Sequence, residues 1–130
     1  MPTTTTRLVI SSADLLSSTL AIDATATLTQ AGGSTAIAQT SGLGVSSAAD
    51  TSIYTLYAAA SYADNEAAKV YLRNASTDAT HYVTVTIGST SVGRLYAGDV
   101  ALIPWDTTGD FKLTQSNAAI NVEHILFHEG

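Results

Sequence analysis

Cysteine is absent from this chain of 130 residues, and charged side chains are scarce. Without cysteine there is no disulfide framework, no thiol chemistry and no Cys-ligated metal. Only five residues are Lys or Arg, spread over positions 7, 69, 73, 94 and 112, against eleven Asp and Glu. Recognition of phosphates needs clustered cations, so this spread and the net charge of -6 argue against nucleic acid as a direct partner.

Long apolar runs are absent too. No run approaches the roughly 20 residues that span a bilayer, so we expect no membrane partner. The first seven residues, 1–7, lack the basic-then-apolar order of a secretory signal, which predicts a protein made in the cytoplasm. The length suits one domain with an ordered arm.

Hydroxyl side chains are abundant instead. Ser and Thr together make up 34 of the 130 residues, whereas charged residues make up 12%. An ordinary globular domain is about 25% charged. A surface of Thr, Ser, Ala and Gly is typical of exposed β-sheet, and it has few charges to keep neighbouring copies apart. This composition fits a protein that sits in an assembly.

The first third of the chain contains one clear alternating segment, residues 19–29. Its apolar positions are Leu20, Ile22, Ala24, Ala26 and Leu28. A period of two predicts a half-buried strand. The Gly-rich turn at 31–34 and a returning strand at 35–40 complete a predicted hairpin. A short apolar run at 7–10 precedes it, and a small-residue loop at 41–47 separates this region from the later strands.

Alternation is nearly continuous in the rest of the chain. We predict strands at 53–57, 69–74, 81–87, 92–96, 100–104, 111–114 and 120–127, with polar turns between them. The Ala-rich segment 58–68 is the one helix candidate. Strands at this spacing are the pattern of an all-β protein, and we predict an antiparallel β-sandwich, with the jelly roll as one form of it. The predicted organisation is a flexible Thr-rich N-terminal arm, 1–7, and a single β-sandwich domain, 8–130.

The three histidines are the first candidates for metal or catalysis. His124 and His128 are four residues apart, which on a helix would place both on one face. The β-branched and aromatic residues around them predict a strand, where four residues span about 13 Å and cannot share an ion. His81 is interpreted as a partly exposed residue at a strand end. We therefore predict no metal site and no cofactor.

No catalytic signature is visible either. There is no G-x-S-x-G elbow, although a Ser-His-Asp triad leaves no local signature because its members need not be adjacent. Asp99, Asp106 and Asp110 lie in predicted turns, where Asp commonly bonds nearby backbone. We predict no catalytic residues and a protein that is not an enzyme.

Aromatic side chains offer one further binding chemistry. A platform for sugar rings would use Tyr54, Tyr57, Tyr62, Tyr71, Tyr82, Tyr96 and Trp105. Tyrosine with alternating neighbours is more often a cross-strand packing residue with its hydroxyl at the rim. Arg73 and Arg94 are expected to pair with Asp99 or Asp78, each pair contributing about 0–1 kcal/mol.

The C-terminal half carries a pattern of strands and turns, over about residues 69–128. One strand ends in Arg73-Asn74, and a hairpin comes after it. Next come the turn Gly93-Arg94-Leu95-Tyr96-Ala97-Gly98-Asp99 and an apolar strand that closes on Pro104, with 122–127 as the last strand. This resembles the small β-sandwich virion proteins of tailed bacteriophages, a group that includes capsid decoration (cement) proteins and minor tail proteins.

The resemblance implies a non-enzymatic structural protein of the virion, assembled in the host cytoplasm. Its expected role is a capsid decoration protein that bridges major capsid subunits. The expected partners are the major capsid protein and further copies of itself, as a homo-oligomer that is a trimer or dimer. Two alternatives stay open, a minor tail or fibre-associated protein and a carbohydrate-binding β-sandwich module.

Overall fold

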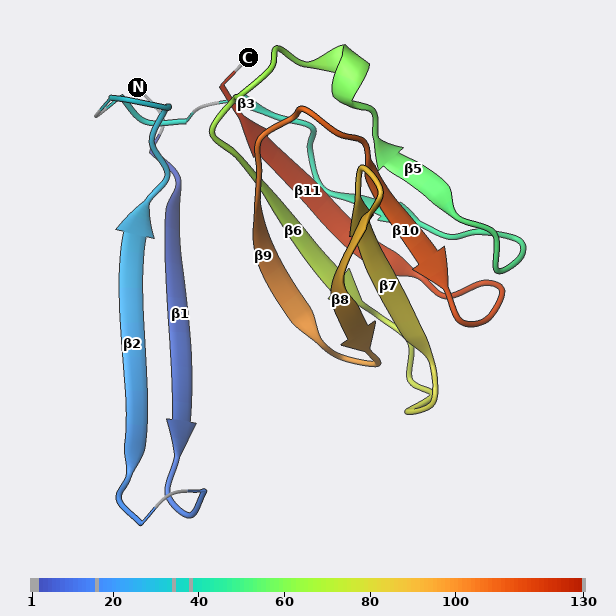
Figure 1. Cartoon of the computed structure of the whole chain (residues 1–130). Coiled ribbons are helices and arrows are strands. Elements are labelled where there is room, and N and C mark those ends of the chain that lie inside the picture. The colour runs from blue at the N-terminus through green and yellow to red at the C-terminus, as the bar shows by residue number, and fades with distance from the viewer. Residues whose placement is uncertain (1–2, 16, 34, 38, 130) are drawn as a thin grey trace. The chain divides into compact units, whose positions relative to one another are not determined.

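The structure, a computed structural model, describes residues 3–15, 17–33, 35–37 and 39–129. It is all β apart from one 3₁₀ turn, η1 (Ala59–Ser61). The chain divides into two compact units, Met1–Ala38 and Gln39–Gly130, which Figure 1 draws in blue to teal and in teal to red. Within the described ranges, no helical segment has the length and hydrophobicity to cross a bilayer.

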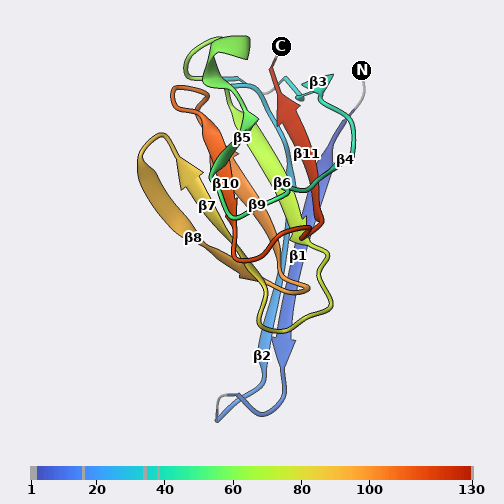
Figure 2. The same cartoon turned by 90° about the vertical axis from the view of Figure 1, so that its right-hand side faces the viewer.

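The second unit is an antiparallel β-sandwich, as the sequence predicted. One sheet has the strand order β5 (Tyr54–Tyr57), β10 (Phe111–Gln115), β7 (Tyr82–Ile87) and β8 (Thr90–Tyr96). The other has the order β3 (Gln39–Thr40), β11 (Val122–His128), β6 (Ala68–Asn74) and β9 (Val100–Trp105), and β4 (Gly44–Ser46) also pairs with β11. The two sheets lie face to face in Figure 2. The jelly-roll form stays a prediction.

The core of the sandwich lies between these sheets. In β7, Val83 and Val85 are buried while Tyr82 and Thr84 between and beside them are partly exposed, as the period of two requires. Both sheets contribute to one cluster of buried apolar side chains, which includes Tyr57, Ala68, Val70, Leu72, Val83, Val85, Leu95, Trp105, Phe111, Leu113, Val122 and Leu126. Each fully buried large side chain of this kind contributes about 1.5–3 kcal/mol.

The predicted helix at 58–68 is wrong. Only Ala59–Ser61 forms a 3₁₀ turn, and the chain then runs irregularly into β6. Tertiary contacts override the helix propensity of alanine here. The Tyr62 ring packs edge-on against Trp105, and the Glu66 backbone N–H donates to the Thr107 hydroxyl (3.2 Å).

The first unit is built around a long antiparallel hairpin, β1 (Thr5–Ser12) with β2 (Leu20–Thr27). The two strands run side by side in Figure 1. Beyond the hairpin, Leu28 donates its N–H to the Thr4 carbonyl (2.9 Å) and accepts from the Ile37 N–H (2.8 Å). Leu28 and Ile37 are buried, but most residues of both strands are exposed.

Two predictions about this region need correction. We expected β2 to pair with a strand at 35–40, but its partner is β1, and the later segment pairs with residues 28–30 beyond β2, through the bridge between Thr29 and Ala36. Within the predicted turn and returning strand, positions 34 and 38 lie outside the described residues. The strand was also expected to be half-buried, whereas Ile22, Ala24 and Ala26 are exposed.

The predicted arm and domain boundary also differ from the structure. Residues 1 and 2 lie outside the described residues, and Thr5–Arg7 of the expected arm belongs to β1. The two units divide after residue 38 rather than after residue 7, close to the small-residue loop at 41–47.

Candidate functional site

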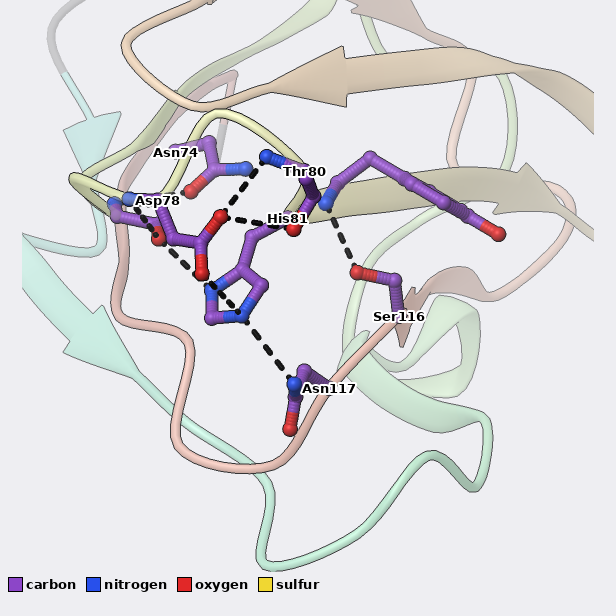
Figure 3. A network of polar contacts seen from close by, with 8 residues as sticks. Asn74, Asp78, Thr80, His81, Ser116 and Asn117 are labelled. Carbon is purple, nitrogen blue, oxygen red and sulfur yellow. Dashed lines mark hydrogen bonds and ion pairs between the residues drawn. The ribbon is translucent and has the colours of Figure 1, made fainter.

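The loop between β6 and β7 holds a network of polar side chains, drawn in Figure 3. Ser76 Oγ lies 2.9 Å from His81 Nδ1, and Asp78 Oδ2 lies 3.5 Å from His81 Nε2. The structure thus brings together the three residue types of a Ser-His-Asp triad. Hydrogen bonds to the carboxylate from the Thr80 backbone N–H (2.9 Å) and hydroxyl (2.7 Å) lower the pKa of Asp78.

The hydrogen bonds of this network link the residues of the loop to one another and to the segment after β10. The Asn117 side-chain amide nitrogen lies 3.2 Å from His81 Nε2, the same ring nitrogen that faces the Asp78 carboxylate. Ser76 Oγ also accepts from the Asp78 N–H (3.2 Å). Ser76, Asp78 and His81 thus hold one another within the β6–β7 loop.

The same loop is fastened to the core by Asn74, whose side chain is fully buried. Its Nδ2 donates to the Leu95 carbonyl (2.9 Å), and its Oδ1 accepts from the Ser76 N–H (3.0 Å). Where the loop enters β7, the Tyr82 N–H donates to the hydroxyl of Ser116, the residue after β10 (2.9 Å). These bonds fix the loop where the chain passes from β6 in one sheet to β7 in the other.

His124 and His128 lie on strand β11, as predicted, and have different surroundings. His124 Nδ1 is 2.7 Å from the Tyr57 hydroxyl, and burial lowers the pKa of His124. A Cβ added at Gly44 would lie 2.9 Å from the His124 ring, so this position has no room for a side chain. Tyr57 belongs to the core cluster, so its contact links His124 to the core.

His128 faces a buried carboxyl group instead. Its Nδ1 lies 3.6 Å from Oε2 of Glu66, whose other oxygen accepts from the Ala63 N–H (3.2 Å). Glu66 borders a cavity of about 370 Å³, which Lys69 and Trp105 also line. Among the residues that the structure describes, no three His, Asp or Glu side chains group as they would around a metal ion.

Of the three turn aspartates, Asp99 and Asp106 bond local backbone, as the sequence predicted, whereas Asp110 bonds a distant segment. Asp99 Oδ2 accepts from the Tyr96 N–H (2.8 Å), and Asp106 Oδ1 accepts from the Thr108 N–H (3.1 Å) and hydroxyl (2.7 Å). These Thr108 hydrogen bonds lower the pKa of Asp106. Asp110 Oδ1 accepts from the Ala59 N–H (2.9 Å). The first two carboxylates thereby shape their own turns, and the third joins the start of β10 to η1.

The predicted partners of the two arginines are wrong. Arg73 pairs with Glu123 across the neighbouring strand (3.3 Å), and not with Asp99 or Asp78. The Arg94 guanidinium lies over the Tyr82 ring, 4.2 Å from its centroid. The observed partners, Glu123 and Tyr82, are therefore residues of adjacent strands, whose register the sequence alone does not give.

The aromatic residues lie mostly in the core rather than on a platform. Tyr57 and Trp105 are buried and contact each other, with ring centroids 6.2 Å apart. Tyr82 and Tyr96 form a cross-strand pair, with ring centroids 5.5 Å apart. Since Tyr96 is 45% exposed, this pair with Arg94 is the one aromatic surface of the described residues that resembles a sugar-stacking site.

The most extensive candidate is the apolar face of the β1–β2 hairpin. The register places the pairs Thr6–Ala26, Leu8–Ala24, Ile10–Ile22 and Ser12–Leu20 on one face. Leu8, Ile10 and Ile22 on this face are 56%, 44% and 42% exposed. None of these eight paired residues is charged. A sheet face of this kind in water is typical of an interaction surface.

The opposite face of the hairpin is polar and carries one ion pair. It contains the pairs Thr5–Thr27, Arg7–Thr25, Val9–Asp23 and Ser11–Ala21. Arg7 donates two hydrogen bonds to Asp23, at 2.9 and 2.7 Å, which lower the pKa of Asp23. The hairpin is therefore amphipathic, with its apolar face presented for contact. Sequence reasoning found the apolar residues of β2 but not the β1 partner that completes the face.

Comparison of this chain with protein-family models, with curated proteins and with solved structures finds no match.

Proposed function

We propose that this chain is a non-enzymatic structural protein of a phage particle, a capsid decoration protein that bridges major capsid subunits. The observation that carries the proposal is the amphipathic β1–β2 hairpin, whose apolar face is exposed although a separate unit of the chain has a full core. A rigid sandwich suits a structural protein of a particle. An exposed apolar hairpin suits a protein that binds neighbouring subunits.

The surface composition supports the same role. Charged residues make up only 12% of the chain, so contacts with neighbouring subunits are dominated by apolar and hydroxyl groups rather than by ion pairs. The polar networks of the sandwich also support it, because their side chains are used to fix turns, as at Asp78 and Asp106. The strand and turn pattern of residues 69–128 is the reason for assigning the assembly to a phage particle.

The test is binding to bare capsids of the phage that encodes the chain. Purified protein and capsids are mixed, sedimented and analysed for bound protein, with capsids of an unrelated phage as the control. We expect saturable binding to the cognate capsids alone and a rise in their thermal disruption temperature. Binding to isolated tails without binding to capsids would favour the minor tail or fibre alternative. Absence of both would reject a virion role.

A second candidate function is carbohydrate binding, favoured by Tyr82, Tyr96 and Arg94. The two rings form a pair on β7 and β8, and Arg94 covers one of them. Sugar rings stack on exposed aromatic faces, and each lost stacking face costs roughly 0.5–1.5 kcal/mol. Titration with a panel of oligosaccharides, followed by the variant Tyr96→Ala, tests it. Binding that Tyr96→Ala weakens would support this function.

A further inference from the structure

In the part of the chain that the structure describes, the β1–β2 hairpin leaves an apolar face exposed to water and its strand edges unpaired. A two-stranded hairpin is at best marginally stable in water, and here Leu8, Ile10 and Ile22 stay exposed on one face. In the described residues, β1 pairs with β2 and with no other strand, and the outer edge of β2 over Leu20–Thr27 likewise has no strand partner. Unpaired edges accept further strands. An occupant that meets both needs must supply apolar surface and strand edges together.

Another copy of the hairpin supplies both. Its apolar face has the same composition and no charge, so two such faces meet without repulsion although the chain carries a net charge of -6. Its edges are those of an antiparallel pair, which a further antiparallel strand extends. A second copy of this chain therefore fits the face and the edges at once.

The ion pair on the outer face selects which edges meet. Arg7 lies on β1 and Asp23 on β2, so each hairpin presents a cation beside one edge and an anion beside the other. Pairing β1 with β1, or β2 with β2, places like charges on the two sides of the junction. Pairing β1 with β2 of the next copy places opposite charges there, which favours a head-to-tail arrangement. Head-to-tail contacts form rings when the rotation closes.

The buried area and the number of strands in a closed barrel together indicate how many copies associate. Strands of eight residues give one hairpin face an area of about 250 Å², so two faces alone bury about 500 Å², well below the roughly 1,200 Å² of a stable interface. A closed ring also buries the edges at every junction. Two copies give four strands, too few for any interior, and eight strands leave an interior that large side chains fill. Half of the inward residues here are small: Thr6, Ser12, Ala24 and Ala26.

We propose that three copies of this chain associate through their β1–β2 hairpins. The β1 edge of each copy pairs with the β2 edge of the next, and six antiparallel strands close around Leu8, Ile10, Leu20 and Ile22 of each copy. Closure leaves no free edge and covers the apolar face. The inference deepens the proposed function, on which it rests only in treating the chain as a part of an assembly.

The first test is the mass of the purified full chain in solution, measured by light scattering. We expect three times the chain mass of 13.4 kDa. The variant Ala24→Asp places a charge inside the ring and should lose the trimer, whereas Thr25→Asp, the same charge on the adjacent outward position, should keep it. Both residues are exposed within one copy, so neither change disturbs its own packing. Unchanged melting of the Trp105 fluorescence in both variants controls for the fold of the sandwich.

Hydrogen exchange then separates edge pairing from packing of faces alone. In a closed ring, successive amides along β1 and β2 are all protected, whereas packing of faces leaves the amides of the outer edges fast. A monomer, dimer or tetramer, a trimer that survives Ala24→Asp, or fast outer-edge amides in the trimer would each overturn the proposal. A trimer that ignores capsids would reject the proposed function alone, and a monomer that binds capsids would reject the ring alone.

Discussion

Strands β7 and β2 have the same alternating pattern and opposite surroundings. In β7, Val83 and Val85 are 0% and 2% exposed, because the facing sheet of the sandwich covers them. In β2, Ile22 is 42% exposed, and Ala24 beside it on the face is exposed too. A period of two therefore tells which residues share a face, but not whether the same chain provides the cover.

The polar groups of the two regions differ in the same way. In the sandwich, Asn74 is fully buried and satisfied by two hydrogen bonds, so its loss leaves buried partners unpaired. In the hairpin, the Arg7–Asp23 pair is open to water, with side chains 65% and 54% exposed. Interactions of the first kind stabilise a fold, and those of the second kind contribute little to it.

The largest expected difference between the regions comes from removing a large apolar side chain. Phe111→Ala should lower the free energy of unfolding of the sandwich by about 3–5 kcal/mol, since Phe111 is fully buried. Ile22→Ala should change the same free energy of the sandwich by less than about 0.5 kcal/mol, because the core cluster of the described residues contains no residue of the hairpin. Urea unfolding followed by Trp105 fluorescence measures both. Equal losses of unfolding free energy in the two variants would contradict the difference in burial between the two regions.

The next effect concerns the buried amide of the sandwich. Asn74→Ala should cost about 1–3 kcal/mol, because the Leu95 carbonyl and the Ser76 N–H lose their partner. Asn117→Ala is the matched control, since its amide contacts His81 at an exposed site and should cost less than about 0.5 kcal/mol. Thermal unfolding of both variants tests this order, and the reverse order would refute the role assigned to Asn74.

A smaller effect appears as a dependence on pH. Burial lowers the pKa of His124 from 6.5, so the unfolded chain takes up its proton at a higher pH than the folded one. Stability is therefore complete above about pH 6.5 and falls as the pH drops from there through the lowered folded pKa. His124→Gln should reduce the loss in melting temperature between about pH 8 and about pH 5. An unchanged loss in this variant would rule out His124 as its source.

The smallest effect is expected in the hairpin. Arg7→Gln should shift the melting temperature of the folded chain only slightly, because the pair with Asp23 is exposed. Raising the salt concentration from about 0.1 to about 1 M should remove even this difference, since the screening length falls from about 10 to about 3 Å. Melting curves of the two proteins at both salt concentrations give the comparison. A large, salt-insensitive loss would place Arg7 in a buried contact.

The sandwich was largely predictable because its strands carry their own signals. Val83 and Val85 alternate with Tyr82 and Thr84, and polar turns flank the strand, so its bounds and its buried face could be inferred from sequence. The failure at 58–68 has a tertiary cause. Its alanines favour a helix, but the contact of Tyr62 with Trp105 and the buried carboxyl of Glu66 impose an irregular path that no local rule anticipates.

Partners between distant segments were not predictable in the same way. Nothing in residues 20–27 indicates that they pair with Thr5–Ser12 rather than with the segment after the turn, because either choice satisfies the period of two. Arg94 likewise stacks on Tyr82 only because the register of β7 and β8 aligns them. The Ser76, Asp78 and His81 network lies within one loop, and its turn-forming residues were the signal that could have located it.

The most direct test of the contrast between the two regions is thermal unfolding at protein concentrations about a hundredfold apart. Trp105 fluorescence reports the sandwich, and far-ultraviolet circular dichroism reports both regions. We expect the Trp105 transition to stay at one temperature, whereas the hairpin transition rises with concentration, because association stabilises only the region that binds copies. Two transitions that ignore concentration, or that shift together, would contradict an independent sandwich joined to a hairpin stabilised by its neighbours.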